Sequence, residues 1–146
     1  ELDALLKRLD MLVLNDSEAR LMTGEQELLK AGKQIQKLGP ATVIIKKGEH
    51  GALAVTEDGP FVLPGYPLEE VVDPTGAGDC FAGGILGYLA AQGEVSGKSL
   101  RRAIAHGAVV ASYNVQGFSL DRLRQVQRND LDRRFEELLA MLKVAP

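Results

Sequence analysis

The stretch Asp73-Pro74-Thr75-Gly76-Ala77-Gly78-Asp79 decides the interpretation of this chain, because it joins two glycines to a carboxylate at a predicted helix start. The apolar pair Val71-Val72 before it is predicted to end a strand. After it, apolar residues recur at helical spacing from Phe81 onward. The pattern therefore predicts a strand-to-helix turn rich in glycine.

Such a turn has a specific chemical capacity. Backbone N–H groups at a helix start lack intrahelical partners, and the helix dipole favours an anion there. Gly76 and Gly78 let the main chain approach phosphate closely, and the Asp79 carboxylate could accept the proton of an attacking hydroxyl. Phosphoryl transfer fits this combination. The alternative is an ordinary glycine-rich turn in which Asp79 only favours the first helical turn.

This stretch resembles the C-terminal signature of the ribokinase-like, or PfkB, family of carbohydrate and nucleoside kinases. It matches neither a P-loop nor the dinucleotide-binding fingerprint. The resemblance implies an α/β protein with a three-layer α/β/α sandwich that uses ATP to phosphorylate a hydroxyl of a sugar or nucleoside. It implies Asp79 as the catalytic base and the amides of Gly76, Ala77 and Gly78 as the anion hole.

A second segment, Asn15-Asp16-Ser17-Glu18, follows an apolar run at 11–14 that is predicted to be a buried parallel strand. Open α/β sheets bind ligands at such strand ends. The segment resembles the family's Asn-x-x-Glu element, which implies that Glu18 acts on Mg²⁺ through water and that Asn15 helps to place phosphate. The alternative is that Asp16 or Ser17 caps a helix.

The third segment contains two β-rich runs joined by Gly48-Glu49-His50-Gly51, which predicts a hairpin. Lys46 stands at the end of the first run. The segment resembles the family's Lys-x-Gly-x-x-Gly nucleotide loop, which implies that Lys46, Gly48 and Gly51 bind nucleotide. A lysine before a glycine turn is otherwise most often a solvated charge.

Ser99 is predicted to cap a helix with a narrow face of small residues. The resemblance implies that adenine packs on this face near His106 and that the loop at 115–119 closes the pocket. The alternatives are close helix packing and a core histidine. The resemblance also implies a K⁺ site made by backbone carbonyls of Asp73, Thr75, Ser112, Val115 and Gly117.

The rest of the chain alternates strands and helices, which predicts four or five strands with helices on both faces. An amphipathic helix from Leu28 ends at Gly39-Pro40. A final helix is predicted to begin at Asn129, with Asp132-Arg133-Arg134 on its solvated face. Further strands are expected near residues 43, 53 and 61, before a loop at 64–67.

Composition limits the partners and the compartment. The 146 residues are 45% hydrophobic and 25% charged, with a net charge of −3 and without a basic stripe, so nucleic acid is not an expected partner. No apolar run approaches membrane-spanning length, so no membrane partner is expected. The single cysteine, Cys80, excludes an internal disulfide and favours a reducing, cytoplasmic compartment. A buried thiol is expected rather than a reactive one.

The resemblance covers nearly all of this sequence but only part of a family member. It implies that residues 1–146 are the C-terminal nucleotide-binding and catalytic portion of one ribokinase-like domain. The acceptor-binding elements and lid would lie in a missing N-terminal half, so the acceptor is not identified and activity of the fragment alone is not expected. A cut sheet would leave an open edge, which predicts self-association. The remaining alternative is a non-catalytic nucleotide-binding or regulatory module on the same fold.

Overall fold

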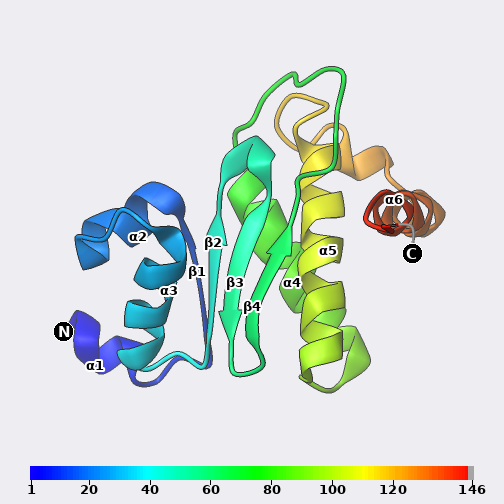
Figure 1. Ribbon diagram of the computed structural model, residues 1–146. Helices are drawn as coiled ribbons and strands as arrows, with labels where there is room; N and C mark the ends of the chain where they lie inside the picture. The colour runs from blue at the N-terminus through cyan, green and yellow to red at the C-terminus, as the bar shows by residue number, and fades with distance from the viewer. Residues whose placement is uncertain (145–146) are drawn as a thin grey trace. The chain divides into compact units, whose positions relative to one another are not determined.

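A computed structural model describes residues 1–144 and shows a mixed α/β chain with a partial ribokinase-like fold. The chain divides into two compact units, Glu1–Gly65 and Tyr66–Pro146 (Figure 1). The first unit holds all four strands of the described residues, and the second is helical apart from its loops. The two units are therefore built on different packing principles.

The first unit is a mixed sheet with strand order β1-β2-β3-β4. β1 and β2 pair in parallel, and the other two pairings are antiparallel. The predicted hairpin is confirmed, with a short 3₁₀ turn, η1, inside it. The elements of this unit are α1 (Leu2–Leu6), β1 (Met11–Asn15), α2 (Asp16–Thr23), α3 (Leu28–Lys37), β2 (Thr42–Lys46), η1 (Gly48–His50), β3 (Ala52–Thr56) and β4 (Gly59–Leu63).

Helices α2 and α3 form the crossover between the parallel strands β1 and β2, as Figure 1 shows. Their apolar sides meet alternate residues of the strands in one aliphatic cluster. Complete burial of each large aliphatic side chain contributes roughly 1.5–3 kcal/mol, so this cluster holds the unit together. Its buried members are Leu14, Ala19, Ala31, Ile35, Val43 and Ile45.

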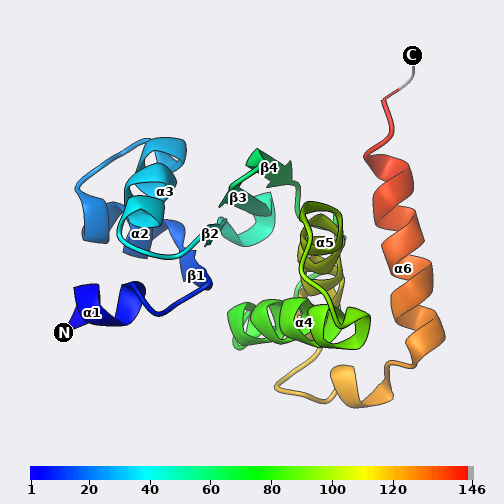
Figure 2. The same cartoon turned by 90° about the horizontal axis from the view of Figure 1, so that it is seen from below.

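The second unit contains α4 (Ala77–Gln92), α5 (Gly97–Asn114), η2 (Leu123–Gln125) and α6 (Arg128–Met141). Helices α4 and α5 pack against each other (Figure 2). They come closest at two glycines, because a Cβ on Gly84 would lie 2.8 Å from Gly107 Cα. A Cβ on Gly107 would lie 2.6 Å from the carbonyl oxygen of Phe81. At Gly107, the small-residue face of α5 therefore packs on another helix, which fits the close-packing alternative.

Three predicted boundaries are also wrong. Residues 71–72 form no strand, since β4 ends at Leu63 and an irregular segment leads from there to α4. The amide of Val72 donates to the carbonyl of Val115 instead of a neighbouring strand. Ser96 rather than Ser99 caps α5, and Gln127 rather than Asn129 precedes α6. In both helices the actual cap forms a reciprocal pair with the residue three positions later.

Arg134 departs from the predicted solvated face of the last helix. Its guanidinium lies 3.4 Å from the centre of the Tyr113 ring and donates to Ser112 Oγ at 2.9 Å. Arg134 therefore connects α6 to α5 through these two contacts. Among the described residues, no helix is long and apolar enough to span a membrane.

Candidate functional site

Two predicted phosphate-binding residues meet at the carboxyl edge of the parallel strands. Asn15 ends β1, Lys46 ends β2, and the strand register makes these two residues direct partners. Within residues 1–144, the Lys46 ammonium group forms no ion pair or hydrogen bond. The sheet therefore presents an amide and an unpaired positive charge side by side at the edge where α/β proteins bind ligands.

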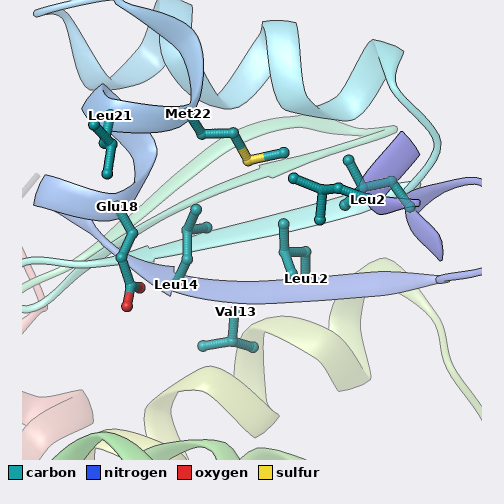
Figure 3. A pocket seen from close by; sticks show the side chains of 8 residues that line it. Leu2, Leu12, Val13, Leu14, Glu18, Leu21 and Met22 are labelled. Carbon is teal, nitrogen blue, oxygen red and sulfur yellow. The ribbon is translucent and has the colours of Figure 1, made fainter. Parts of the chain in front are cut away.

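Asn15 and Glu18 also form a capping box at the start of α2. Asn15 Oδ1 accepts from the Glu18 amide, and Glu18 Oε2 accepts from the Asn15 amide, both at 2.7 Å. The helix cap is thus Asn15, and the alternatives Asp16 and Ser17 are wrong. The box leaves Asn15 Nδ2 and Glu18 Oε1 without a partner in the described part of the chain. Figure 3 shows the Glu18 carboxylate turned away from the leucines beside it.

This carboxylate fits Mg²⁺ as a single, water-mediated ligand. Mg²⁺ keeps several waters and usually takes one or two carboxylates together with substrate phosphates. The residues in the described range contain no cluster of three or more acidic, histidine or cysteine side chains able to hold a metal. A site at Glu18 would therefore take its remaining ligands from water and from phosphate oxygens.

The two hairpin glycines have different roles. Gly51 has φ +89°, and a Cβ there would lie 2.0 Å from the carbonyl oxygen of Leu63, so a close backbone approach requires glycine. Gly48 has φ +57° and open space around its Cβ position. Only Gly48 thus leaves room for a ligand to approach the main chain.

The signature turn presents unpaired amides at the start of α4. Gly76 has φ +80° and immediately precedes the helix, while the Thr75 amide donates to Asp73 Oδ1 at 2.9 Å. The Ala77 amide donates to the Pro74 carbonyl at 3.2 Å. In the part of the chain that is described, the amides of Gly76, Gly78 and Asp79 have no acceptor. These three amides can receive an anion at once, whereas Ala77 must first give up a bond.

The carboxylate of Asp79 is exposed in the first turn of α4, as the predicted base requires. Among residues 1–144 it has no hydrogen-bond or ion-pair partner. Burial, with a smaller contribution from the Asp79 charge, raises the pKa of the neighbouring Cys80 thiol. Cys80 is thus a poor nucleophile, as expected, but it is half-buried rather than buried.

The carbonyls predicted to bind K⁺ come together but do not all fit a cation. The Val115 carbonyl accepts the amides of Val72 and Asp73, at 2.8 and 3.2 Å. The Thr75 carbonyl accepts from Asn114 Nδ2 at 2.9 Å. Two of the five oxygens therefore already have protein donors, and Val115 has both of its acceptor positions in use. Nearby, the buried Oε1 of Gln116 has no donor in the described residues.

His106 lies in an aromatic stack that joins three helices. Its ring is stacked on Tyr88 of α4 at a centroid distance of 4.4 Å and on Phe135 of α6 at 4.0 Å. Burial, followed by the nearby positive charge of Arg102, lowers the pKa of His106 to about 4. Both ring faces are covered, so His106 cannot stack on adenine, and its position fits the core-histidine alternative.

Sequence reasoning missed Asn114 and Tyr66. Asn114 is buried and bonds across 39 positions to the glycine turn. Tyr66 donates from its hydroxyl to Glu137 Oε2 at 2.7 Å and lies under the Arg134 guanidinium. A single amide or tyrosine has no recognisable spacing, and these contacts depend on how distant segments fold together.

Comparison with known proteins indicates one family. Residues 1–123 match the sequence profile described as pfkB family carbohydrate kinase. The chain is 40% identical to a cytidine kinase of Thermococcus kodakarensis over 88 residues, 58% of this chain and 31% of that protein. It is 30% identical to a ribokinase of Haemophilus influenzae over 118 residues, 77% of this chain and 37% of that protein.

Solved structures show the same likeness. Aminoimidazole riboside kinase from Salmonella enterica, complexed with aminoimidazole riboside and an ATP analog, matches 91% of this chain with a TM-score of 0.80 and 27% identity. A nucleoside kinase of Burkholderia thailandensis in complex with inosine matches 95% with a TM-score of 0.72 and 30% identity. This chain covers 44% and 42% of those two chains, so it spans less than half the length of these relatives.

Proposed function

Because the chain belongs to the PfkB family of carbohydrate kinases, we propose that it supplies the nucleotide-binding and catalytic portion of a kinase that transfers phosphate from ATP to a hydroxyl of a sugar or nucleoside. The observation that carries this proposal is the start of α4, where the exposed Asp79 carboxylate adjoins the unpaired Gly76 and Gly78 amides. We place this activity in the cytoplasm.

In the proposed reaction, Asp79 accepts the proton of the acceptor hydroxyl while the hydroxyl oxygen attacks the terminal phosphorus of ATP. The bond from that phosphorus to the bridging oxygen breaks, and ADP leaves. The amides at 76–78 stabilise negative charge on the transferred phosphoryl group, with Ala77 exchanging its bond to Pro74 for one to phosphate. Lys46 neutralises phosphate charge, and Asn15 Nδ2 donates a hydrogen bond to it. Glu18 would hold Mg²⁺ through water, and the ion would offset charge on the ATP phosphates.

Gly48 gives ATP access to the main chain of the hairpin, whereas Gly51 shapes that hairpin. The complex with an ATP analog belongs to the Salmonella enzyme and supports ATP as the phosphate donor here. Relatives named for ribose, cytidine and aminoimidazole riboside support a sugar or nucleoside acceptor. K⁺ fits the carbonyl set less well, because Thr75 and Val115 already accept hydrogen bonds.

The proposed base is tested by Asp79→Asn in the full-length kinase. The amide keeps the shape but is not basic, so turnover should fall by about 100-fold or more while the ATP dissociation constant changes little. Asp58→Asn, at an exposed aspartate beyond β3, serves as the matched control and should leave both values unchanged. Near-normal turnover of the Asp79 variant would favour the non-catalytic nucleotide-binding module.

The proposed metal ligand has a separate test. Glu18→Gln removes the charge that attracts Mg²⁺ and should raise the Mg²⁺ concentration needed for half-maximal rate. An unchanged Mg²⁺ dependence would leave Glu18 with its capping role alone.

We further propose that two copies of this chain associate along β1. This strand is an edge of the sheet, and an apolar groove of about 510 Å³ adjoins it. Figure 3 shows Leu12, Leu14, Leu2 and Met22 around the groove.

A second copy should bury more than about 1,000 Å² of total surface. Sedimentation at micromolar concentration should detect a dimer, and Leu21→Lys should weaken it more than Val95→Lys, which is similarly exposed. A clean monomer would contradict the proposal.

A further inference from the structure

The side chain of Asn114 connects the buried end of α5 to the signature turn. Asn114 is only 1% exposed, and its Nδ2 donates to the Thr75 carbonyl at 2.9 Å. The Cβ position of the next residue, Gly76, lies 3.7 Å from the same nitrogen. We propose that Asn114 is a positioning residue, which fixes the turn so that its amides face an incoming phosphate.

The geometry of one peptide group supports this role. In a trans peptide, the C=O and N–H bonds point in opposite directions. The Thr75 carbonyl and the Gly76 N–H belong to the same peptide, and Asn114 holds that carbonyl toward α5. The Gly76 N–H is therefore directed away from α5, into the exposed side of the turn, where it has no acceptor among residues 1–144.

The turn is held from its other end as well. The Asp73 carboxylate accepts the Thr75 amide, and this backbone bond lowers the pKa of Asp73. The Asp73 and Asn114 bonds thus fix the two peptides on either side of Thr75. Gly76 follows in a left-handed conformation, with φ +80°, and α4 begins one residue later. Release of the Thr75 carbonyl would free the peptide that sets this conformation.

Asn114 also donates to the Thr75 carbonyl oxygen, which the family resemblance implied as a ligand of K⁺. The hydrogen bond from Asn114 to the Thr75 carbonyl joins residues 73–75 to α5. A cation bound to carbonyls of both segments would make the same connection. The positioning role itself concerns the chain's own hydrogen bond, and only its effect on nucleotide affinity rests on the proposed function.

The first test is nuclear magnetic resonance on the unmodified chain. We expect a measurable coupling across the hydrogen bond between Asn114 Nδ2 and the Thr75 carbonyl carbon, and slow exchange of the Asn114 side-chain amide protons. Asn129, an exposed asparagine on α6, is the internal control and should exchange rapidly. Asn114 protons that exchange as fast as those of Asn129 would overturn the inference.

The second test separates donation from packing. Asn114→Asp keeps the side-chain shape but replaces the donor by a carboxylate, so the Gly76 and Gly78 amide resonances should shift even without nucleotide. The dissociation constant of MgATP should rise about tenfold, which is the loss expected for one buried hydrogen bond. Asn129→Asp should change neither quantity.

The outcomes distinguish the two proposals. Unmodified chain that fails to bind MgATP would contradict the proposed function, while the Gly76 resonance would still decide the positioning role. A Gly76 resonance that is the same in Asn114→Asp and in the unmodified chain would leave Asn114 as a packing residue. If the Asp variant does not fold, the coupling in the unmodified chain decides the inference.

Discussion

The two units of this chain hold themselves together by different means. The first, Glu1–Gly65, depends on an aliphatic cluster between a sheet and two helices, with Ile35 fully buried in it. The second, Tyr66–Pro146, depends on glycine contacts and on aromatic and arginine side chains. In the described residues, every ring stack lies in the second unit. Aliphatic packing in the first unit depends on side-chain volume. The contacts in the second unit also depend on the orientation of the rings and on the charge of the arginines.

The largest effect should come from the aliphatic cluster. Ile35→Ala removes a fully buried side chain and should lower the free energy of unfolding by about 3.5 kcal/mol, measured by urea denaturation. Hydrogen exchange should increase more in residues 1–65 than in residues 66–144. An equal increase in both ranges would show that the two units unfold together. It would contradict the view that the aliphatic cluster stabilises the first unit in particular.

A smaller loss should follow from adding one methyl group between α4 and α5. Gly107→Ala places a Cβ 2.6 Å from the Phe81 carbonyl oxygen, so the helices must separate, at a cost of about 2 kcal/mol. Gly87→Ala is the matched control, since nothing lies within 4 Å of its Cβ position, and helix propensity predicts a gain of up to about 1 kcal/mol. Thermal unfolding of both variants measures the difference. Equal melting temperatures would contradict close packing at Gly107.

The third effect concerns pH and only the second unit. Because burial lowers the pKa of His106 to about 4, the unfolded chain binds this proton more readily than the folded chain. Stability should therefore fall as pH drops from about 6.5 toward 4, by about 1.5 kcal/mol after solvent screening of a half-buried ring. His106→Phe should remove this dependence, whereas His50→Gln, at an exposed histidine, should retain it. A pH profile unaffected by His106→Phe would contradict the assignment.

The smallest effect should come from the loop before the signature turn. Tyr66→Phe removes the hydroxyl that donates to Glu137 Oε2 but keeps the ring under Arg134. We expect a loss of about 0.5 kcal/mol, because the bond is exposed to water. Tyr66→Leu also removes the ring and should cost more in the same urea titration. A Phe variant as unstable as the Leu variant would assign the contribution to the hydroxyl rather than to the ring.

The comparison also explains what could be predicted from the sequence. Strand ends are predictable because apolar runs stop there, so Asn15 and Lys46 were assigned correctly to the edge of the sheet. The hairpin at Gly48 and Gly51 was equally visible, since glycines mark turns. The family profile and the solved relatives confirm the ribokinase-like fold that these segments indicated.

The helical unit was less predictable because its features depend on contacts between distant segments. A run of small residues fits a ligand or a helix equally well, and only the approach of Gly84 decides between them. Ser96 and Ser99 are equally suitable caps by residue type. The helix begins at Gly97, so Ser96 is the cap and Ser99 pairs with it in the capping box. Residues 71–72 have strand propensity, yet the amide of Val72 donates to the Val115 carbonyl instead of to a neighbouring strand. Tertiary contacts thus overrode local preference.

The glycine contact between α4 and α5 is a point about which a small rotation of α4 would displace the N-terminus of this helix. For a rotation of α4 about Gly84, Gly78 lies six residues from the pivot, about 9 Å along a helix that rises 1.5 Å per residue. A 10° rotation about this pivot would carry the signature amides through roughly 1.5 Å, and a displacement near 1 Å can cost on the order of 100-fold in rate. Substitutions at Gly84 are therefore expected to alter the proposed phosphoryl transfer while every residue of the turn stays the same.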